Sequence, residues 1–268
     1  MQFEEPAPAK INLALNVRGK LADGRHAIET VFAFCTDGDR LAADQSDGLS
    51  LTVQGQFAGE LGTSEGNLVL RAASALKDRA GVPQGAKLLL TKNLPVASGV
   101  GGGSADAAAA LRLLTRLWNV DPAHASAIAP GLGSDVPACL LSMPARGEGA
   151  GDQLTVIDLG NLSGAPVLLV NPRVQLSTAE VFANWGGEAS GPLGDWRDAG
   201  NDLEEPATRL VPQIGAVLAW LSAQPGTTFV RMSGSGATCF ALFESEEARG
   251  NAEIAVPREW WRLTTYLR

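Results

Sequence analysis

Two glycine-rich segments are the clearest candidates for chemistry in this chain. The first, Gly99-Val-Gly-Gly-Gly-Ser104, is followed at once by an alanine- and leucine-rich stretch, which predicts that a helix begins close to Ser104. Glycines let backbone N–H groups approach a ligand, and a helix N-terminus favours an anion. The segment therefore predicts a phosphate site, with a tight turn as the alternative, although it has neither the P-loop lysine nor the glycine spacing of a dinucleotide fold. The second segment, Gly234-Ser-Gly236, fits an ordinary turn equally well.

Three ionisable side chains are candidates for a catalytic role, and the sequence allows a structural role for each of them as well. Lys10 lies between a proline-containing segment and an apolar strand, where the alternative is a solvated lysine. Asp135 precedes Val136-Pro137, where it can also cap a short helix, and His26 follows a turn, where it can be a surface residue. Because His124 is the only other histidine, there is little room for a histidine-based triad or a metal cluster. The chemistry must rest on carboxylates, lysine and backbone.

The composition is that of a folded protein with one large or two small domains. The chain has 268 residues, 45% of them hydrophobic and 19% charged, and its net charge of −8 argues against general nucleic-acid binding or an anionic membrane surface. Its three cysteines are too far apart for a zinc site and odd in number, which indicates a reducing compartment. The N-terminus lacks a signal-peptide pattern, and no stretch is long and apolar enough to span a membrane. We therefore expect a cytoplasmic protein.

The hydrophobic pattern predicts a mixture of strands and helices. Strands are expected over residues 11–17, 27–34, 49–53, 87–91 and 167–170, and helices over residues 67–79, 105–114, 123–129 and 214–222. Residues 183–200 have the composition of a loop, and the segment after Gly236 runs into an apolar strand. A change of composition near residue 160 marks the expected boundary between a domain of residues 1–158 and one of residues 159–268.

Three segments together resemble the motifs of the GHMP kinase superfamily, which includes galactokinase, homoserine kinase, mevalonate kinase and phosphomevalonate kinase. They are Pro8-Ala-Lys-Ile-Asn-Leu13, the stretch from Leu94 to Ala108, and Ser233-Gly-Ser-Gly-Ala237, and they occur in this order across nearly the whole chain. The resemblance implies an α+β fold of two domains. The N-terminal one is an α/β domain like domain 2 of ribosomal protein S5, and the C-terminal one is an α+β, ferredoxin-like domain.

Local strings narrow the resemblance within the superfamily. Ala9-Lys-Ile-Asn12, Asp23-Gly-Arg-His26 and Gly133-Ser-Asp-Val-Pro137 are similar to the kinases that act on a cytidine diphosphate alcohol in the non-mevalonate isoprenoid route. What this implies is ATP-dependent phosphorylation of the 2-hydroxyl of the methylerythritol moiety. The alternatives are another small-molecule kinase, similar to mevalonate or homoserine kinase, and a non-catalytic ATP-binding module.

The resemblance also implies the residues of the site. Lys10 and Asp135 are the expected catalytic pair, in which Asp135 accepts or orients the hydroxyl proton and Lys10 offsets charge on the moving phosphoryl group. ATP is expected to contact Lys92, Pro95, Val96, Ala97, Ser98, Gly99, Val100, Gly101, Gly102, Gly103, Ser104 and Ala105, with Ser104 also near Mg²⁺. The substrate is expected to contact Asn12, Arg25, His26, Thr178, Phe182, Gly234, Ser235 and Gly236, with His26 on the cytosine edge.

Two departures from the family pattern concern the substrate and the phosphates. Arg25 stands where many members carry an aromatic residue, and its guanidinium can either stack on cytosine or point to solvent. Ser104-Ala105 replaces a frequent pair of serines, which leaves the magnesium and phosphate contacts to Ser104 and the backbone. The expected partner is the small-molecule substrate, without nucleic acid or membrane, and the expected state is a monomer or a weak homodimer.

Overall fold

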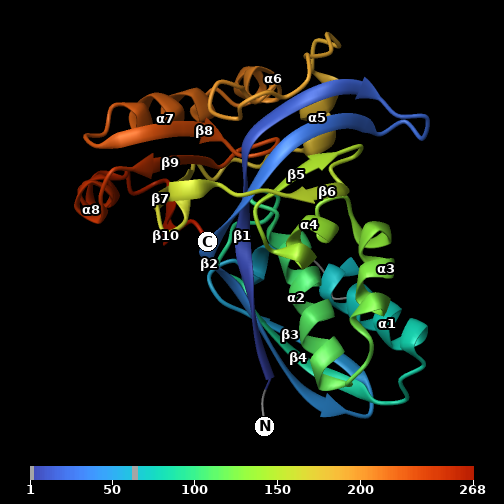
Figure 1. The fold of residues 1–268 in the computed structure, drawn as a ribbon. Coiled ribbons are helices and arrows are strands. Elements are labelled where there is room, and N and C mark those ends of the chain that lie inside the picture. Colours follow the sequence, from blue (N-terminus) through green and yellow to red (C-terminus); the bar gives the residue numbers. More distant parts are fainter. Residues whose placement is uncertain (1–2, 62–65) are drawn as a thin grey trace. The chain divides into compact units, whose positions relative to one another are not determined.

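The computed structural model describes residues 3–61 and 66–268, and these form two compact units that interleave along the chain (Figure 1). Unit 1 comprises the residues up to Ala9, Asp37–Val96 and Gly101–Ser142, and unit 2 comprises Lys10–Thr36, Ala97–Val100 and Met143–Arg268. Strands β1 (Phe3–Lys20) and β2 (His26–Ser46) each pass from one unit to the other without a break. The single sequence boundary at residue 158 is a division of another kind, and it stays a prediction.

Unit 1 consists of strands accompanied by a group of helices. The second half of β2 pairs antiparallel with β4 (Gly85–Thr91), and β3 (Leu49–Gln54) lies parallel to β4. A short 3₁₀ helix, η1 (Ala58–Glu60), follows β3. The helices that pack against one another are α1 (Leu68–Ala80), α2 (Gly102–Leu117), α3 (Pro122–Leu132) and α4 (Val136–Leu141). Most of α2 is buried, because its many alanines allow its neighbours to approach closely.

Unit 2 contains an antiparallel sheet in the order β10 (Trp261–Tyr266), β7 (Pro166–Asn171), β9 (Cys239–Phe243) and β8 (Thr227–Met232). Helices α7 (Gln213–Ser222) and α8 (Glu246–Ala255) pack on this sheet. All five residues of β9 are buried, as expected for a central apolar strand. The remaining elements are β5 (Ala145–Glu148), β6 (Gln153–Val156), η3 (Gly160–Leu162), α5 (Thr178–Ala183) and α6 (Glu204–Leu210). The expected α+β organisation is confirmed.

Every strand and helix expected from the sequence is present, and the differences have local causes. β2 continues through Asp37-Gly38-Asp39, which has the composition of a turn; a Cβ on Gly38 would lie 2.2 Å from the carbonyl oxygen of Ala7, so glycine is what lets the two segments lie together. Helix α2 begins at Gly102, earlier than expected, because Gly101 adopts a φ of 64° at the N-cap. Within residues 3–61 and 66–268, no helix is long and apolar enough to cross a membrane.

Candidate active site

Three of the sequence motifs meet within unit 2. The backbone N–H of Asn12, on β1, donates to the Ser233 hydroxyl at 3.2 Å, and this hydroxyl donates to the carbonyl oxygen of Gly99 at 2.8 Å. The backbone N–H of Lys10 donates to the carbonyl oxygen of Val100 at 3.0 Å. The start of the first glycine-rich segment is therefore tied to β1 directly and, through one serine, to the second glycine-rich segment.

Two of the glycines at this junction are required by the fold itself. Gly99 has a φ of 80°, and a Cβ there would lie 2.4 Å from the carbonyl oxygen of Ser233. Gly234 has a φ of 56°, and a Cβ there would lie 3.2 Å from the Asn12 side-chain oxygen. Both backbones are in a conformation that favours glycine, and both lie against neighbours. The interpretation of these two glycines as turn residues is thus correct, whether or not a ligand binds beside them.

Lys10 is a buried lysine with defined partners. Its side chain belongs to a residue that is 3% exposed, and its Nζ donates to Asn12 Oδ1 at 2.8 Å and lies 5.3 Å from the ring centroid of Phe32. Asn12 Nδ2 donates in turn to Thr30 Oγ1 at 2.7 Å. The alternative of a solvated lysine is therefore wrong. Since both polar groups of the Asn12 side chain are engaged, Asn12 orients Lys10, and its expected contact with substrate stays a prediction.

The last part of the glycine-rich segment forms the first turn of α2, in unit 1. The N–H groups of a first helical turn have no partner within the helix, so Gly102, Gly103 and Ser104 lie where an anion is favoured. Gly103 is exposed, and a Cβ there would meet only a Leu68 methyl carbon at 3.5 Å, an ordinary contact. The fold does not require glycine at this position. Close approach of a ligand to the backbone is the explanation that the sequence predicts, and it stays a prediction.

Gly103→Ala separates these two explanations. We expect the variant to be as stable as the wild type or more stable by up to about 1 kcal/mol, because alanine is the better helix former. We expect its KM for ATP to rise about tenfold or more, because a methyl group then stands between the phosphates and the backbone. Thermal unfolding and steady-state kinetics give the two values. Gly131→Ala in α3, also exposed and without neighbours within 4 Å, is the matched control. An unchanged KM for ATP in Gly103→Ala would place the phosphates elsewhere.

A buried ionic cluster lies beside the same helical turn. Lys92 is 1% exposed, and its Nζ donates to Asp39 Oδ2 at 2.5 Å and to Asp106 Oδ2 at 2.7 Å. The other oxygen of Asp39 accepts the N–H groups of residues 93–94, and a Cβ on Gly102 would lie 2.9 Å from Lys92 Nζ. The cluster thus joins α2 to β2 and to the end of β4. Direct contact between Lys92 and the nucleotide stays a prediction.

The cluster holds two carboxylates against one ammonium. Burial raises the pKa of Asp106 to about 7, with Asp39 adding to the rise and Lys92 opposing it. Burial disfavours the Lys92 ammonium, but Asp106 and Asp39 outweigh this effect and raise the pKa of Lys92. Asp106 Oδ1 is buried and has no hydrogen-bond partner among the described residues. Asp106 is therefore the member of the cluster that takes up a proton near neutral pH.

Asp106 should make stability depend on pH. A carboxyl whose folded pKa lies above its unfolded value binds a proton more tightly in the folded chain, so its contribution to stability is present at low pH and is lost as the pH rises from about 4 through about 7. The loss is at most about 1.4 kcal/mol per pH unit. Asp106→Asn should remove this dependence of stability on pH, measured by urea unfolding at pH 5, 6, 7 and 8. The control Asp44→Asn, at an exposed position, should keep it. Parallel curves for wild type and Asp106→Asn would contradict the assignment.

Asp135 occupies the N-cap position of α4 without acting as the cap. Its backbone is helical, at φ −85° and ψ −12°, and its side chain makes no N-cap hydrogen bond. Asp121, at the N-cap of α3, shows the ordinary arrangement: an extended backbone and a carboxylate that accepts the Ala123 N–H at 2.8 Å. The capping role considered for Asp135 is therefore wrong. Asp135 lies in unit 1 and Lys10 in unit 2, and their meeting beside a reacting group stays a prediction.

A cavity of about 470 Å³ lies in unit 2 at the end of β1 and the start of β2. His26, Phe182, Trp185, Gly187 and Lys20 line it, with two alanines of α5. The His26 ring stacks on Phe182 with centroids 4.4 Å apart, and the Trp185 ring stands perpendicular to it at 5.8 Å. Burial, with a smaller contribution from the Lys20 charge, lowers the pKa of His26. This direction favours the neutral imidazole, in which one nitrogen donates a hydrogen bond and the other accepts one.

Of the other expected substrate residues, Thr178 contacts a glycine-rich segment and Arg25 does not line the cavity. Thr178 Oγ1 lies 2.8 Å from Ser235 Oγ, so α5 contacts the second glycine-rich segment. Arg25 instead pairs with Asp23 at 2.7 Å and with Asp152 at 3.7 Å, and it is not among the residues that line the cavity. Sequence reasoning missed Trp185. The only signal was a tryptophan in a glycine-containing loop, and such a loop carries no periodic pattern.

The residues present fit a magnesium ion held mainly by nucleotide. Within residues 3–61 and 66–268, no group of three or more His, Cys, Asp or Glu side chains is arranged to hold a metal ion. Mg²⁺ in kinases is commonly bound by few protein oxygens together with phosphates and water. The half-buried Ser104, in the first turn of α2, can supply one hydroxyl oxygen of that kind.

Comparison with known proteins gives the same family over the whole chain. Residues 67–143 match the GHMP kinases N terminal domain and residues 189–262 the GHMP kinases C terminal domain. The 4-diphosphocytidyl-2-C-methyl-D-erythritol kinase of Rhizorhabdus wittichii is 51% identical, over 100% of this chain and 96% of its own. The kinase of that name from Hyphomonas neptunium is 46% identical, and the match covers 97% of this chain and 95% of the relative.

A solved structure agrees with these relatives. The crystal structure of a 4-(cytidine 5'-diphospho)-2C-methyl-D-erythritol kinase matches this chain with a TM-score of 0.83 and 32% identity, over 98% of each chain. Sequence and fold therefore point to one family, and the buried Lys10 and the two joined glycine-rich segments are the features of this chain that correspond to its motifs. The chain belongs to the GHMP kinases and, among them, to the 4-diphosphocytidyl-2-C-methyl-D-erythritol kinases.

Proposed function

We propose that this chain transfers the γ-phosphoryl group of ATP to the 2-hydroxyl of 4-diphosphocytidyl-2-C-methyl-D-erythritol. The observation that carries the proposal is the full-length identity with kinases of that name. The geometry supports it independently. Unit 2 holds a buried lysine on a strand that is joined to both glycine-rich segments, and it holds a cavity with aromatic walls and a histidine whose pKa is lowered by burial.

Lys10 and Asp135 are the proposed catalytic pair. A carboxylate is too weak a base to ionise an alcohol beforehand, so the proton leaves late, as the new O–P bond forms, and Asp135 orients the hydroxyl and then accepts the proton. Lys10 offsets negative charge on the phosphoryl group. At an effective dielectric constant of about 20, an ammonium about 4 Å from a phosphoryl oxygen contributes on the order of 4 kcal/mol before desolvation reduces it. The hydrogen bond to Asn12 holds Lys10 in one orientation, so this charge is preorganised.

The first turn of α2 is the proposed phosphate site. Its backbone N–H groups bind the ATP phosphates, and the exposed Gly103 leaves room for them. Mg²⁺, when bound, neutralises phosphate charge, and the Ser104 hydroxyl is its proposed ligand from this chain. The Lys92 cluster holds this turn against β2 and β4, so Lys92 acts on the nucleotide through the position of the helix.

The cavity beside His26 is the proposed site of the cytidine end. The pairing edge of cytosine offers both donors and acceptors, and a neutral imidazole can make one hydrogen bond to it, either donating through its N–H or accepting at its other nitrogen. Phe182 fixes the imidazole by stacking, so the histidine is held ready for the base. Helix α5, which supplies Phe182 to this cavity, also contacts the second glycine-rich segment through Thr178 and Ser235.

The deciding experiment is a product assay. Purified protein is incubated with Mg-ATP and 4-diphosphocytidyl-2-C-methyl-D-erythritol, and mass spectrometry is used to look for a product heavier by one phosphoryl group together with stoichiometric ADP. Mevalonate and homoserine are tested in parallel as acceptors. Product from either of them alone would assign a different small-molecule kinase, and nucleotide binding without any phosphorylated product would indicate a binding module.

A further inference from the structure

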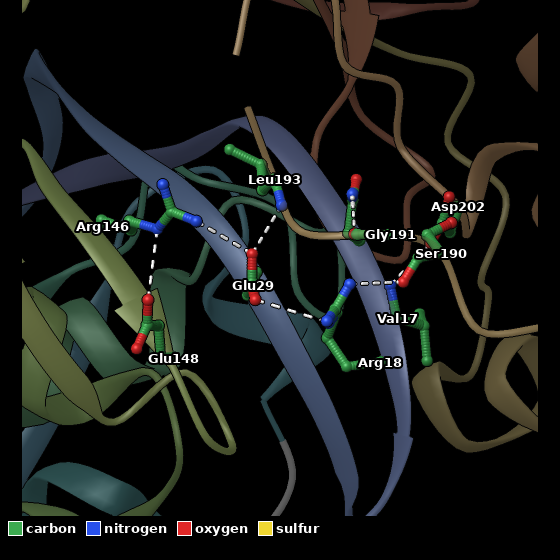
Figure 2. Close-up of polar contacts among 10 residues, drawn as sticks. Val17, Arg18, Glu29, Arg146, Glu148, Ser190, Gly191, Leu193 and Asp202 are labelled. Atoms are coloured by element: carbon green, nitrogen blue, oxygen red, sulfur yellow. Dashed lines mark hydrogen bonds and ion pairs between the residues drawn. The ribbon is translucent and has the colours of Figure 1, made fainter. Parts of the chain in front are cut away.

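Strands β1 and β2 pair as a hairpin, and the loop between α5 and α6 is held to this hairpin by a series of polar contacts (Figure 2). This loop, residues 184–203, has no helix or strand of its own, and loops of such length inside a folded unit are commonly functional. All the residues concerned belong to unit 2.

Glu29, on β2, is the centre of these contacts. Its side chain is 15% exposed, and its Oε2 accepts the backbone N–H of Leu193 at 2.6 Å. The same carboxylate pairs with Arg146 at 2.9 Å and with Arg18 at 3.4 Å. Figure 2 shows Glu29 between the two guanidinium groups, with Leu193 on the loop side. A carboxylate with two cations and a backbone donor is fixed in position, and it fixes the loop in turn.

The neighbouring strand binds the same stretch of loop. Arg18 Nη1 donates to the carbonyl oxygen of Ser190 at 2.5 Å, and the Ser190 N–H donates to the carbonyl oxygen of Val17 at 3.0 Å. Asn16 Nδ2 donates to the carbonyl oxygen of Gly191 at 3.0 Å. Residues 190–193 are thus attached to both strands of the hairpin.

The same two segments build the cavity. The hairpin supplies Lys20 and His26, which flank its turn, and the start of the loop supplies Trp185 and Gly187. The indole is perpendicular to the imidazole, at 88°, so it is not stacked on the histidine, whereas Phe182 is. Arg25, at the position where many family members carry an aromatic residue, is paired with two aspartates. Trp185 is the second large aromatic wall of this cavity.

We propose that Trp185 is a specificity-determining residue that stacks on the base of the substrate, and that Glu29 is the positioning residue that holds Trp185 in place through the loop. The inference rests on the proposed function, which supplies the cytosine ring. Stacking on an aromatic side chain is favourable for any base, so the indole adds affinity while His26 adds the choice of base. Glu29 does not touch the substrate; its effect passes through residues 190–193.

The test compares Trp185→Ala, Trp185→Phe and Glu29→Gln in steady-state kinetics. Trp185→Ala is expected to raise KM for the cytidine diphosphate substrate about tenfold or more, with KM for ATP within about twofold, because only base stacking is lost. Trp185→Phe should recover part of this loss. Glu29→Gln should raise the same KM about three- to tenfold, and adding it to Trp185→Ala should have no further effect, because the two residues act as one unit.

Glu148→Gln is the matched control. Glu148 pairs with the same Arg146, at 3.3 Å, and no dashed line joins it to the loop in Figure 2, so its replacement should leave KM unchanged. Tryptophan fluorescence during titration with cytidine diphosphate gives a reading that does not depend on turnover. A signal in the wild type that is lost in Trp185→Phe supports the proposal, and a signal that shifts to higher concentrations in Glu29→Gln supports the role of Glu29.

The outcomes separate the inference from the proposed function. If the wild type forms no phosphorylated product from the cytidine diphosphate alcohol, the proposed function fails. If the wild type forms it and Trp185→Ala keeps a wild-type KM, the stacking role is wrong. If the increases in KM of Trp185→Ala and Glu29→Gln add in the double variant, and Glu29→Gln by itself lowers the melting temperature, Glu29 has a purely structural role.

Discussion

Asp135→Asn is expected to lower kcat by about 10³-fold while KM for both substrates stays within about threefold. Asparagine has the shape of aspartate but neither its charge nor its ability to accept a proton, so binding is kept and the transition state loses its base. Because Asp135 does not cap α4 with its side chain, the substitution should leave helix stability nearly unchanged. Initial rates with saturating ATP and alcohol, with thermal unfolding alongside, provide the measurement.

Asp121→Asn is the control for this substitution. Asp121 does accept an N-cap hydrogen bond, and asparagine caps helices about as well, so activity and stability should both stay near wild type. A turnover of Asp135→Asn close to that of the wild type would defeat the assignment of Asp135 as proton acceptor, because an amide can orient a hydroxyl but cannot take its proton.

Lys10→Met probes the other half of the pair. Methionine keeps the buried apolar stem and removes the ammonium, so the expected loss is again in kcat, by about 10²- to 10³-fold, since preorganised charge acts mainly on the transition state. Removal of the cation also leaves Asn12 Oδ1 without this donor, so a small loss of stability should accompany it. A rise in KM alone would indicate that Lys10 merely binds the phosphates.

Lys92→Met is the substitution with the largest expected effect on stability. It leaves Asp39 and Asp106 together in a buried site without their cation, and breaking a buried ion pair from one side costs about 3–5 kcal/mol. The destabilisation should be greater at pH 8 than at pH 5, because protonation of Asp106 at the lower pH leaves one charged carboxylate. Urea unfolding at the two pH values measures both effects.

A second substitution makes the interpretation specific. Asp106→Asn in the Lys92→Met background removes one of the two uncompensated carboxylates and should restore part of the lost stability, mostly at pH 8. Lys87→Met, at an exposed position of β4, the strand that ends directly before Lys92, should change stability by no more than about 0.5 kcal/mol. An equally small effect of Lys92→Met would show that the cluster is not what holds the first turn of α2.

The sequence predicted the parts of the site that follow from local composition. Glycines before an alanine-rich stretch indicate the start of a helix, and α2 begins there, whereas the anion site at that start stays a prediction. Lys10 stands in a motif of known type. The apolar runs of β4, β7 and β9 are equally local signals. These features could be found because the physical reason for each residue lies within a few positions of it in the chain.

The parts that could not be predicted depend on distant partners. Asp39 stands in an Asp-Gly-Asp string that indicates a turn, and only the pairing with Lys92, far along the chain, explains why it lies buried in a strand. Glu29 has the pattern of an outward-facing strand residue, and its role needs the loop at Leu193. The sequence left two roles for Arg25, stacking on the base or pointing to solvent, and in the structure its guanidinium pairs with two aspartates. Charge pairing across a fold leaves no periodic trace in the sequence.

The uninterrupted course of β1 and β2 through both units has a consequence for dissection of this enzyme. A fragment that stops at residue 158 would lack Ser233, whose hydroxyl accepts from Asn12 and donates to Gly99. Neither of the two fragments produced by a cut at residue 158 therefore contains a complete site. Exchange of modules between relatives should succeed only when the crossover points follow the interleaved segments, and complementation by separately expressed halves should require that they associate during folding.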